Sequence, residues 1–391
     1  MSSDQKTWIY ADHAASAPLC PASLHAMLPW LTDEYANASA LHGPGRRARK
    51  AVETARRQIA ACLGARAEEI RFTSGGTESD NWAITGTAKA LAGRGRHIVT
   101  TSIEHPAVKR TCLRLAAQGF EVTSVNPGRD GIIRPADIEA ACRPDTILIS
   151  CMAVNHETGA VQPMEAIAEI ASRRGISFHS DMVQAAGKIP LDLDAAGVSL
   201  AAFSAHKFGG PKGVGILYIR KDITLPPLLS GGEQEWGLRP GTENVAGIAG
   251  TAAALEWMTE QYSSHSALVT ALREELLDSL PAGYVLNGAG GIPEIINLRY
   301  DGVNGEELTL RLDLDHVAIS TGSACTSGDH EPSPGLTSMG LSDREALSSV
   351  RISIGPENTP EQMRRMGEVI RHAVTEIRRR HHMTDRDAAS K

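Results

Sequence analysis

The size and charge of the chain exclude several classes of protein before any motif is considered. Its 391 residues, 42% of them hydrophobic, suffice for one large domain and a smaller one. The formal net charge of -7 argues against nucleic-acid binding as the main function, so small molecules and proteins are the expected partners. No run approaches the roughly 18 apolar residues of a membrane span, and the first residues lack the pattern of a signal peptide, so we expect a cytoplasmic location.

The N-terminal part of the sequence predicts an arm followed by helices. Residues 8–15 form a strand-like run that stops at small residues and Pro18, and we assign residues 1–20 to an arm associated with the smaller domain. A helix is expected over residues 21–31. After the turn-rich segment 37–45 comes a basic helix that ends at Gly64, and its apolar residues fall on one face, which we expect to be core.

A strand, a glycine turn and a helix follow one another from residue 70 onward. The strand covers residues 70–72, the turn is Thr73-Ser-Gly-Gly-Thr77, and the helix runs over residues 78–91. This order points backbone N–H groups and the helix dipole at an anion. The turn lacks the G-x-x-x-x-G-K-[ST] pattern of nucleoside triphosphate sites, so one phosphate is the expected ligand; an ordinary strand-to-helix turn is the alternative.

Strands and helices then alternate up to residue 179, which predicts an α/β fold. The expected strands are 97–101, 120–125, 146–152 and 176–179, and the expected helices are 106–118, 135–141 and 164–174. Such alternation is typical of a mostly parallel sheet covered by helices on both faces, here in a large domain over residues 21–280. Sites in such sheets collect at the carboxyl ends of the strands, so we expect one cleft. The polar residues that follow five strands are Thr77, Glu104 with His105, Asn155 to Thr158, Asp181 with Gln184, and His206 with Lys207.

The stretch from residue 203 to residue 215 contains the most informative lysine. An apolar strand, 200–203, breaks at a short polar turn that holds Lys207, and a glycine-rich loop leads to a second strand, 215–219. A lysine at the end of a buried strand is suited to forming a Schiff base, whereas a surface-loop lysine is the simpler alternative. Upstream, a strand delivers Asp181, and a pyridinium nitrogen needs such an anionic partner. Lysine and aspartate together indicate pyridoxal 5'-phosphate.

The C-terminal third predicts a smaller α+β domain over residues 281–382. A turn-rich loop from 230 to 244 precedes two helices, 245–262 and 268–280, and Pro281-Ala-Gly283 marks the boundary. Beyond it we expect strands at 295–299, 317–320 and 350–354, a helix at 306–314, and a closing helix from 360 to about 380. Residues 383–391 are expected to be a frayed tail.

One of the six cysteines differs from the others in its surroundings. Cys325 lies among Ser, Thr, Gly and Ala residues in a loop that we expect to be exposed and mobile, which favours a working nucleophile over an incidental loop thiol. No two cysteines form a C-x-x-C pair, so neither a disulfide framework nor a zinc site is predicted. The other thiols are expected to be mostly buried and inert; they are Cys20, Cys62, Cys112, Cys142 and Cys151.

These motifs together resemble the cysteine desulfurases, which are fold-type I pyridoxal phosphate enzymes of the class V aminotransferase group. The match runs nearly from end to end of the chain, so it is highly specific. It comprises Tyr10-Ala-Asp-His-Ala-Ala15, Phe72-Thr-Ser-Gly-Gly-Thr-Glu-Ser-Asp-Asn81, Asn155-His-Glu-Thr-Gly159, His179-Ser-Asp-Met-Val-Gln184, Ser204-Ala-His-Lys207, Arg239-Pro-Gly-Thr-Glu-Asn244, Gly322-Ser-Ala-Cys325 and Arg351-Ile-Ser-Ile-Gly355. The long segment after Cys325 resembles the branch of the family whose cysteine lies on an extended flexible loop.

The resemblance implies catalytic and ring-binding roles for particular residues. Lys207 would form the Schiff base with the cofactor, and Asp181 would pair with the pyridinium nitrogen. His105 would stack on the ring and belong to the catalytic residues, together with Lys207 and Cys325. The residues expected near the phenolic oxygen of the ring are Gln184 and Asn155.

The resemblance likewise implies how the phosphate and the substrate are held. The phosphate ligands would be Gly76, Thr77, Ser204 and His206. Thr242 would reach the phosphate of a neighbouring subunit, which implies a homodimer with shared sites. Arg351 would bind the substrate carboxylate through its bidentate guanidinium group, and the other residues expected at the substrate are Asn37 and Asn155.

The implied reaction converts L-cysteine to L-alanine and leaves a persulfide on Cys325, which a sulfur-acceptor protein collects. That acceptor is an iron–sulfur scaffold or a component of tRNA thiolation or DNA sulfur modification, and no metal, membrane or direct nucleic-acid binding is expected. The alternatives are a selenocysteine lyase, a related class V lyase or aminotransferase, and a non-catalytic pyridoxal phosphate-binding scaffold. Two positions depart from the family pattern, since Trp236 and Pro356 stand where arginine is common.

Overall fold

The computed structural model describes residues 8–288, 290–321 and 331–389 of the chain. Its largest sheet has seven strands, and every strand except β8 runs in the same direction. The strands in spatial order are β2 (Ile70–Thr73), β8 (Gly215–Ile219), β7 (Leu200–Ser204), β6 (Ser177–Asp181), β5 (Thr146–Ser150), β3 (His97–Thr101) and β4 (Glu121–Val125). This arrangement confirms the predicted α/β fold with a mostly parallel sheet.

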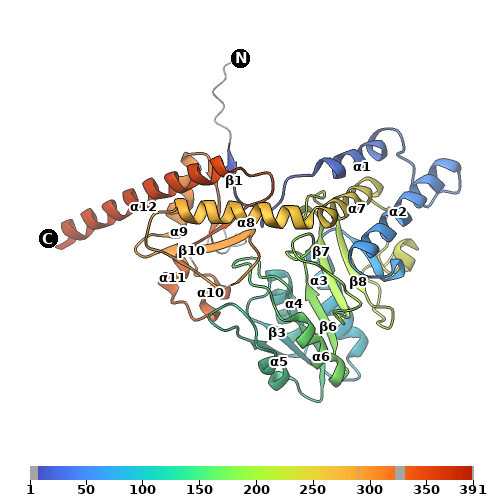
Figure 1. Cartoon of the computed structure of the whole chain (residues 1–391). Coiled ribbons are helices and arrows are strands. Elements are labelled where there is room, and N and C mark those ends of the chain that lie inside the picture. Colours follow the sequence, from blue (N-terminus) through green and yellow to red (C-terminus); the bar gives the residue numbers. More distant parts are fainter. Residues whose placement is uncertain (1–7, 289, 322–330, 390–391) are drawn as a thin grey trace.

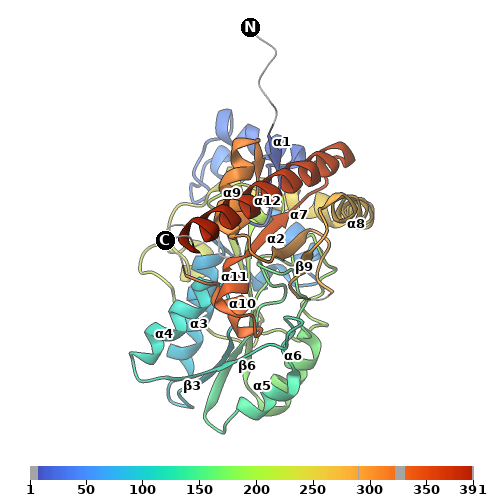
Figure 2. The same cartoon turned by 90° about the vertical axis from the view of Figure 1, so that its left-hand side faces the viewer.

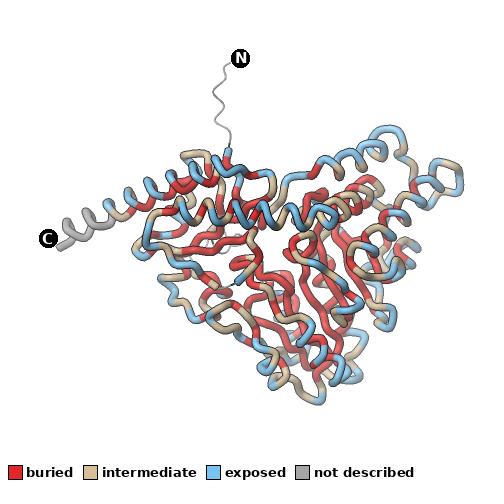
Figure 3. Tube along the Cα trace, in the orientation of Figure 1, coloured by how far each residue is buried: buried red, intermediate tan, exposed pale blue. Residues whose placement is uncertain are grey.

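Helices cover both faces of this sheet because successive strand residues enter different cores. On β3, Ile98 packs with α3 and α4, whereas Val99 belongs to the main core on the opposite face. Figure 3 shows the resulting burial, with the central strands buried and the outer sides of the helices exposed. The helices of this part are α1 (Pro21–Thr32), α2 (Gly43–Cys62), α3 (Gly76–Leu91), α4 (Pro106–Ala116), α5 (Pro135–Ala141), α6 (Met164–Arg174) and α7 (Val245–Glu260).

A second sheet is antiparallel and has its own core. Its strands in order are β12 (Ser320–Thr321), β13 (Ser349–Ser353), β10 (Ile295–Tyr300) and β9 (Tyr284–Leu286). Beside it, β1 (Ile9–Tyr10) pairs in parallel with β11 (Val317–Ala318), which places the N-terminal arm against the second part of the molecule. The helices of this part are α8 (Tyr262–Ser279), α9 (Gly305–Leu314), α10 (Pro334–Ser338), α11 (Asp343–Leu347) and α12 (Pro360–Ala389).

The long helix α8 joins the two parts of the molecule. It follows α7 after the single residue Gln261, and its Val269, Leu272 and Leu276 enter the second core together with residues of α12. Figure 1 shows α8 extending from α7 toward α12. In the turned view of Figure 2, α9 and α12 lie at one end of the molecule and α5 and α6 at the other. Among the described residues, no helix is both long and apolar enough to cross a membrane.

Three sequence predictions about local structure were wrong in detail. Helix α8 begins at Tyr262 instead of residue 268, because the chain interrupts the helical path only at Gln261. The single strand expected over 317–320 is two short strands, since β11 pairs with β1 while β12 pairs with β13. Helix α12 continues to Ala389, so residues 383–389 are helical and not a frayed tail; no glycine or proline follows Gly367 to stop it.

Candidate active site

A cavity of about 470 Å³ lies where the carboxyl ends of β2, β3, β5, β6 and β7 meet. The second part of the molecule closes it with Arg351 from β13, and the N-terminal arm adds Ala14 and Ala15. Most of the residues predicted from the sequence line this one cavity. They are Gly76, Thr77, His105, Asp181, Gln184, Ser204, His206, Lys207 and Arg351.

Lys207 ends a single turn of 3-10 helix that follows β7 directly. The turn closes through a hydrogen bond from the Phe208 N–H to the Ala205 carbonyl, which also accepts from the Gly210 N–H; a Cβ at Gly210 would lie only 2.8 Å from the Ala205 Cβ. This tight turn directs the lysine toward the arm, where Nζ donates to the carbonyl oxygens of Ala14 (2.7 Å) and Ala15 (2.9 Å). The amine is therefore held at the wall of the cavity.

One end of the cavity is built to hold an anion. Gly76 opens α3, and a Cβ there would lie 2.7 Å from the Val183 Cγ2, so the backbone N–H groups of the first turn stay accessible only with glycine. The Ser204 and Thr77 hydroxyl groups face the same space. Burial and the neighbouring lysines lower the pKa of His206 to about 4, so this imidazole is a neutral hydrogen-bonding group at neutral pH. These features fit a phosphate group.

The opposite end of the cavity concentrates buried carboxyl groups. Asp181 is the last residue of β6, and its Oδ1 accepts a hydrogen bond from the Val183 N–H at 2.9 Å. Burial raises the pKa of Asp181, while His105 and Lys207 oppose that rise. Beside it, burial raises the pKa of Asp80 well above its usual value and that of Glu104 to about 8.

These carboxyl groups also test whether the expected cofactor fits. Oδ1 of Asp80 has only the His179 Nε2 near it, at 3.4 Å, and one oxygen of Glu104 is buried without a hydrogen-bond partner among the described residues. A protonated ring nitrogen would bring positive charge to the one end of the cavity where buried carboxyl groups crowd together. With a phosphate site at one end and Asp181 at the other, the cavity fits pyridoxal phosphate.

Two histidines form the wall between β3 and β5. His105 caps the N-terminus of α4, where its Nδ1 accepts a hydrogen bond from the Ala107 N–H at 3.1 Å. The His156 ring meets it edge-on, with the ring centroids 5.5 Å apart. Burial lowers the pKa of both imidazoles, so His105 presents a neutral ring to the cavity, which is consistent with stacking on a flat cofactor.

Arg351 provides a buried cation in the lining of the cavity. Its Nη2 lies 2.8 Å from the Asp12 Oδ1 and its Nη1 donates to the His156 carbonyl at 3.0 Å. Its Nε is buried and has no hydrogen-bond partner among the described residues. A guanidinium group fixed on two sides with a donor to spare is suited to a substrate carboxylate.

Three predicted site residues in the described part of the chain do not line this cavity. The Asn155 side chain forms hydrogen bonds within the protein after β5. Its Oδ1 accepts from the Thr158 N–H at 2.8 Å, and its Nδ2 donates to the Ile103 carbonyl. Asn37 is exposed and binds the Ser39 N–H at 2.8 Å, and Thr242 is also exposed. Cys325 lies outside the described residues.

The charged residues of the cavity that escaped the sequence analysis include Asp80 and Lys109. Asp80 lies four residues after Gly76 on α3, and Lys109 lies four residues after His105 on α4. Residues four apart share a face of a helix, so the helical period is the signal that would have found both.

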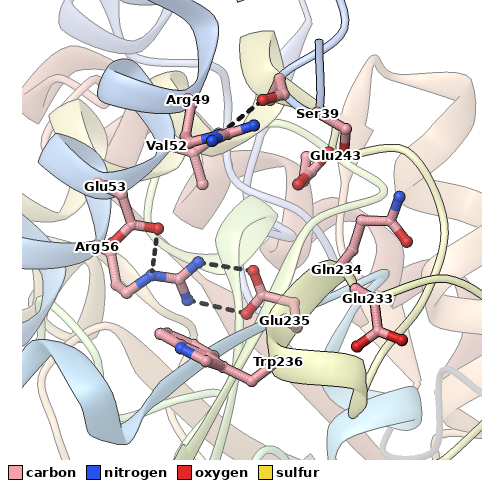
Figure 4. Close-up of a pocket in the computed structure, with 11 residues that line it drawn as sticks. Ser39, Arg49, Val52, Glu53, Arg56, Glu233, Gln234, Glu235, Trp236 and Glu243 are labelled. Atoms are coloured by element: carbon pink, nitrogen blue, oxygen red, sulfur yellow. Dashed lines mark hydrogen bonds and ion pairs between the residues drawn. The ribbon is translucent and has the colours of Figure 1, made fainter. Parts of the chain in front are cut away.

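Trp236, which stands where the family commonly has arginine, lines a second cavity of about 640 Å³, shown in Figure 4. There the two terminal nitrogens of the buried Arg56 donate hydrogen bonds of 2.6 and 2.8 Å to the Glu235 carboxylate. The Trp236 ring stacks on the same guanidinium group. Both Glu235 and Trp236 adopt left-handed backbone angles, with φ of 49° and 58°. This anchor fixes the loop that carries Thr242, and Trp236 does not line the first cavity.

Comparisons with known proteins agree with this geometry. The family model for aminotransferase class-V matches residues 9–366. Cysteine desulfurase IscS of Dictyoglomus turgidum is 42% identical over 378 residues, which are 95% of this chain and 96% of that protein. A solved structure described as a NifS-like protein has a TM-score of 0.90 at 35% identity, covering 94% of this chain and 100% of its own. The structure described as SspA in complex with cysteine has a TM-score of 0.82 at 37% identity, covering 90% and 100%.

Proposed function

The chain belongs to the class-V aminotransferase family and is a pyridoxal phosphate-dependent cysteine desulfurase, and we propose that Lys207, Asp181 and Cys325 carry its reaction on L-cysteine. The observation that supports this proposal most directly is one cavity lined by Lys207, Asp181 and Arg351. An amine, a buried carboxyl group and a guanidinium group facing one space are what a cofactor and an amino-acid substrate require.

Different residues of the cavity bind the cofactor, bind the substrate and transfer protons. Bound pyridoxal phosphate supplies an electron sink for charge that develops at the α-carbon of an amino acid. Asp181 keeps a proton on the ring nitrogen, and Arg351 binds the substrate carboxylate. Lys207 would hold the cofactor through its Nζ and, with substrate bound, this amine would take the proton from the α-carbon and return one later.

Cys325 carries the sulfur transfer. Its thiolate attacks the sulfur of L-cysteine, so a sulfur–sulfur bond forms while the substrate Cβ–S bond breaks. The electron pair of the broken bond stays with the three-carbon fragment, which takes up a proton and leaves as L-alanine. The transferred sulfur remains on Cys325 as a persulfide.

The other cysteines are poorly suited to this step. Burial raises the pKa of each of their thiols, to about 12 for Cys112, and only the thiolate is an effective nucleophile. The same direction holds for Cys20, Cys62, Cys142 and Cys151. Cys325 is therefore the candidate that remains, and its sequence surroundings favour exposure.

The test is to incubate the holoenzyme with L-cysteine, measure alanine and sulfide, and locate added sulfur by mass spectrometry. We expect the mass of one sulfur atom on the Cys325 peptide. Cys325→Ser should bind the cofactor and L-cysteine but release no sulfide, because a hydroxyl group cannot carry a persulfide. Added sulfur on another cysteine, or normal turnover by Cys325→Ser, would overturn the assignment.

We further propose that the enzyme is a cytoplasmic homodimer and that an acceptor protein takes the persulfide sulfur. Residues 21–280 and 281–382 are the proposed domains, with residues 1–20 as an arm. Helix α8 is the last helix before this boundary, and it joins the domains because its Val269, Leu272 and Leu276 enter the core of the second one. Co-purification of proteins with the persulfide-loaded enzyme identifies the acceptor, and an enzyme that never loses its sulfur to any protein fraction would contradict this part.

A further inference from the structure

Lys188 is a buried lysine that the proposed reaction does not use. Only 7% of the residue is exposed, and it follows the end of β6 through a series of backbone turns. Its Nζ donates a hydrogen bond of 2.5 Å to Oε1 of Gln184, four residues earlier. A lysine is costly to bury, so one placed beside a cofactor-site residue needs an explanation.

The contacts of Gln184 fix which way its carboxamide points. Its Nε2 donates to the Ala14 carbonyl at 2.8 Å, and a carbonyl can only accept. Its Oε1 accepts a hydrogen bond from the Lys188 ammonium group, which can only donate. The opposite orientation of the amide would place donor against donor and acceptor against acceptor. The second hydrogen of Nε2 remains for an acceptor in the cavity, which Gln184 lines.

The same network reaches the reactive amine. The Ala14 carbonyl that accepts from Gln184 also accepts from the Lys207 Nζ at 2.7 Å. A continuous path of hydrogen bonds therefore runs from Lys188 through Gln184 and Ala14 to Lys207.

The charges around Lys188 act in opposite directions. Glu294 favours the ammonium form, and one of its oxygens is buried without a hydrogen-bond partner among the described residues. Lys207 and Arg351 disfavour that form, while Arg273 acts on the Glu294 carboxyl group. Burial is the largest influence and lowers the pKa of Lys188 to about 8, so the group is still mostly a cation at neutral pH.

We propose that Lys188 is a positioning residue, whose buried ammonium group locks the Gln184 carboxamide with an N–H facing the cofactor. The inference rests on the proposed place of Gln184 in the cofactor site. The N–H would meet an oxygen acceptor on the cofactor ring, and the positive charge of Lys188 would disfavour further positive charge at Lys207.

The test uses Lys188→Met, which keeps the length of the side chain and removes its charge. Two properties are measured without substrate: the affinity of the apoenzyme for pyridoxal phosphate, and the pH midpoint of the holoenzyme's visible absorption. We expect affinity to fall about tenfold, because a hydrogen bond to a charged group is lost. The midpoint should move upward, because loss of a buried cation stabilises the remaining positive charge. The control is Lys89→Met, the same change at an exposed position in the last turn of α3, which should alter neither.

A double-mutant comparison separates positioning from a general loss of structure. If Lys188 acts through Gln184, Lys188→Met should cost little further cofactor affinity in a Gln184→Met background. An equal loss in both backgrounds, or wild-type affinity and pH midpoint in Lys188→Met, would overturn the proposal.

If Lys188→Met does not fold, a third variant tests the same proposal. Glu294→Gln retains Lys188 but removes the carboxylate that favours its ammonium form, so the fall of cofactor affinity at high pH should begin at lower pH than in wild type. An unchanged profile would contradict the proposal. Wild-type protein that binds no pyridoxal phosphate would instead contradict the proposed function.

Discussion

Asp12 and Arg351 form an ion pair, with 2.8 Å between Oδ1 and Nη2, although 338 positions separate them in the chain. The pairing of β1 with β11 and a bridge from Asp12 to Ser353 bring the arm against β13. The Arg351 side chain is almost fully buried, so its position is set by Asp12 and by the His156 carbonyl. This part of the cavity is thus built where the N-terminal arm packs against β13.

The first prediction concerns this arginine. Arg351→Lys should raise KM for L-cysteine by roughly 10- to 100-fold, since hydrogen bonds to charged groups contribute about 1.5–3 kcal/mol and lysine cannot bind both partners and a carboxylate. Steady-state kinetics measure the effect, with cofactor content unchanged. The control is Arg299→Lys on β10, the strand beside β13; this arginine pairs with Glu345 of α11, and the change should leave KM near wild type. A KM within twofold of wild type for Arg351→Lys would show that another group binds the carboxylate.

The second prediction assigns the covalent link to the cofactor. Borohydride reduction should attach pyridoxal phosphate to the peptide containing Lys207, and Lys207→Ala should lose this link because only a primary amine forms it. The control is Lys212→Ala, a change at an exposed lysine five residues away. Peptide mass spectrometry reads the result. A reducible link that persists in Lys207→Ala would place the reactive amine elsewhere.

The strands and their polar ends could be predicted because the signals are local. The bounds of β3, α5 and α6 follow from hydrophobic period and from prolines at the starts of helices, and the glycine turn before α3 predicts the anion end of the cavity. Asp80 was within reach of the same reasoning, since it lies one helical turn from Gly76.

Contacts between distant segments could not be predicted in this way. Nothing in the sequence near Asp12 indicates its pairing with Arg351, and nothing near Lys188 indicates that its ammonium group is buried. Asn155 illustrates another contact of this kind, because the side chain of a polar residue after a strand can form hydrogen bonds within its own turn. Tertiary packing decides which polar side chains face the cavity.

The third prediction tests the partner of the ring nitrogen. Asp181→Asn should retain pyridoxal phosphate, because the phosphate end is untouched, but kcat should fall by roughly 100- to 1,000-fold, the range for removing one electrostatic stabiliser. A neutral amide cannot keep the ring nitrogen protonated. Cofactor content by absorbance and turnover of L-cysteine are measured together. Turnover within a few-fold of wild type would assign this task to another residue, or to none.

The fourth prediction is a pH dependence of stability at Glu104. Its Oε1 accepts from the Thr101 hydroxyl and the Met152 N–H, and burial raises its pKa to about 8. The native state therefore holds a proton that the unfolded chain releases above about 4.5, so the free energy of unfolding falls as pH rises from about 4.5 to about 8. The full effect is at most roughly 5 kcal/mol, because each unit of pKa difference is worth about 1.4 kcal/mol.

Glu104→Gln removes this titration while keeping an oxygen acceptor and a donor in the same space. Denaturant unfolding of the apoenzyme at pH 5 and at pH 8 should show a larger loss of stability for wild type than for the variant. Equal losses in the two proteins would mean that Glu104 is ionised in the native state.

The last prediction concerns Thr242, which is exposed and does not line the cavity of its own chain. Its loop is anchored by the buried Arg56–Glu235 pair, and Arg239 in the same loop donates from Nε to Glu78 near the start of α3 at 2.9 Å. Because this loop is already fixed, Thr242 can contact a second subunit with little further loss of conformational entropy.

If Thr242 completes the phosphate site of the neighbouring subunit, the defects of Lys207→Ala and Thr242→Ala must complement each other. In a mixed dimer, one site has lost both groups, whereas the other combines an intact Lys207 with an intact Thr242 from the partner and should bind pyridoxal phosphate as in wild type. Dimers reassembled from the two variants, purified by distinct tags, should therefore bind the cofactor more tightly than Thr242→Ala alone, with about half the wild-type sites restored at most. Light scattering confirms the assembly. An active monomer, or mixed dimers with the affinity of Thr242→Ala, would show that each subunit holds the phosphate unaided.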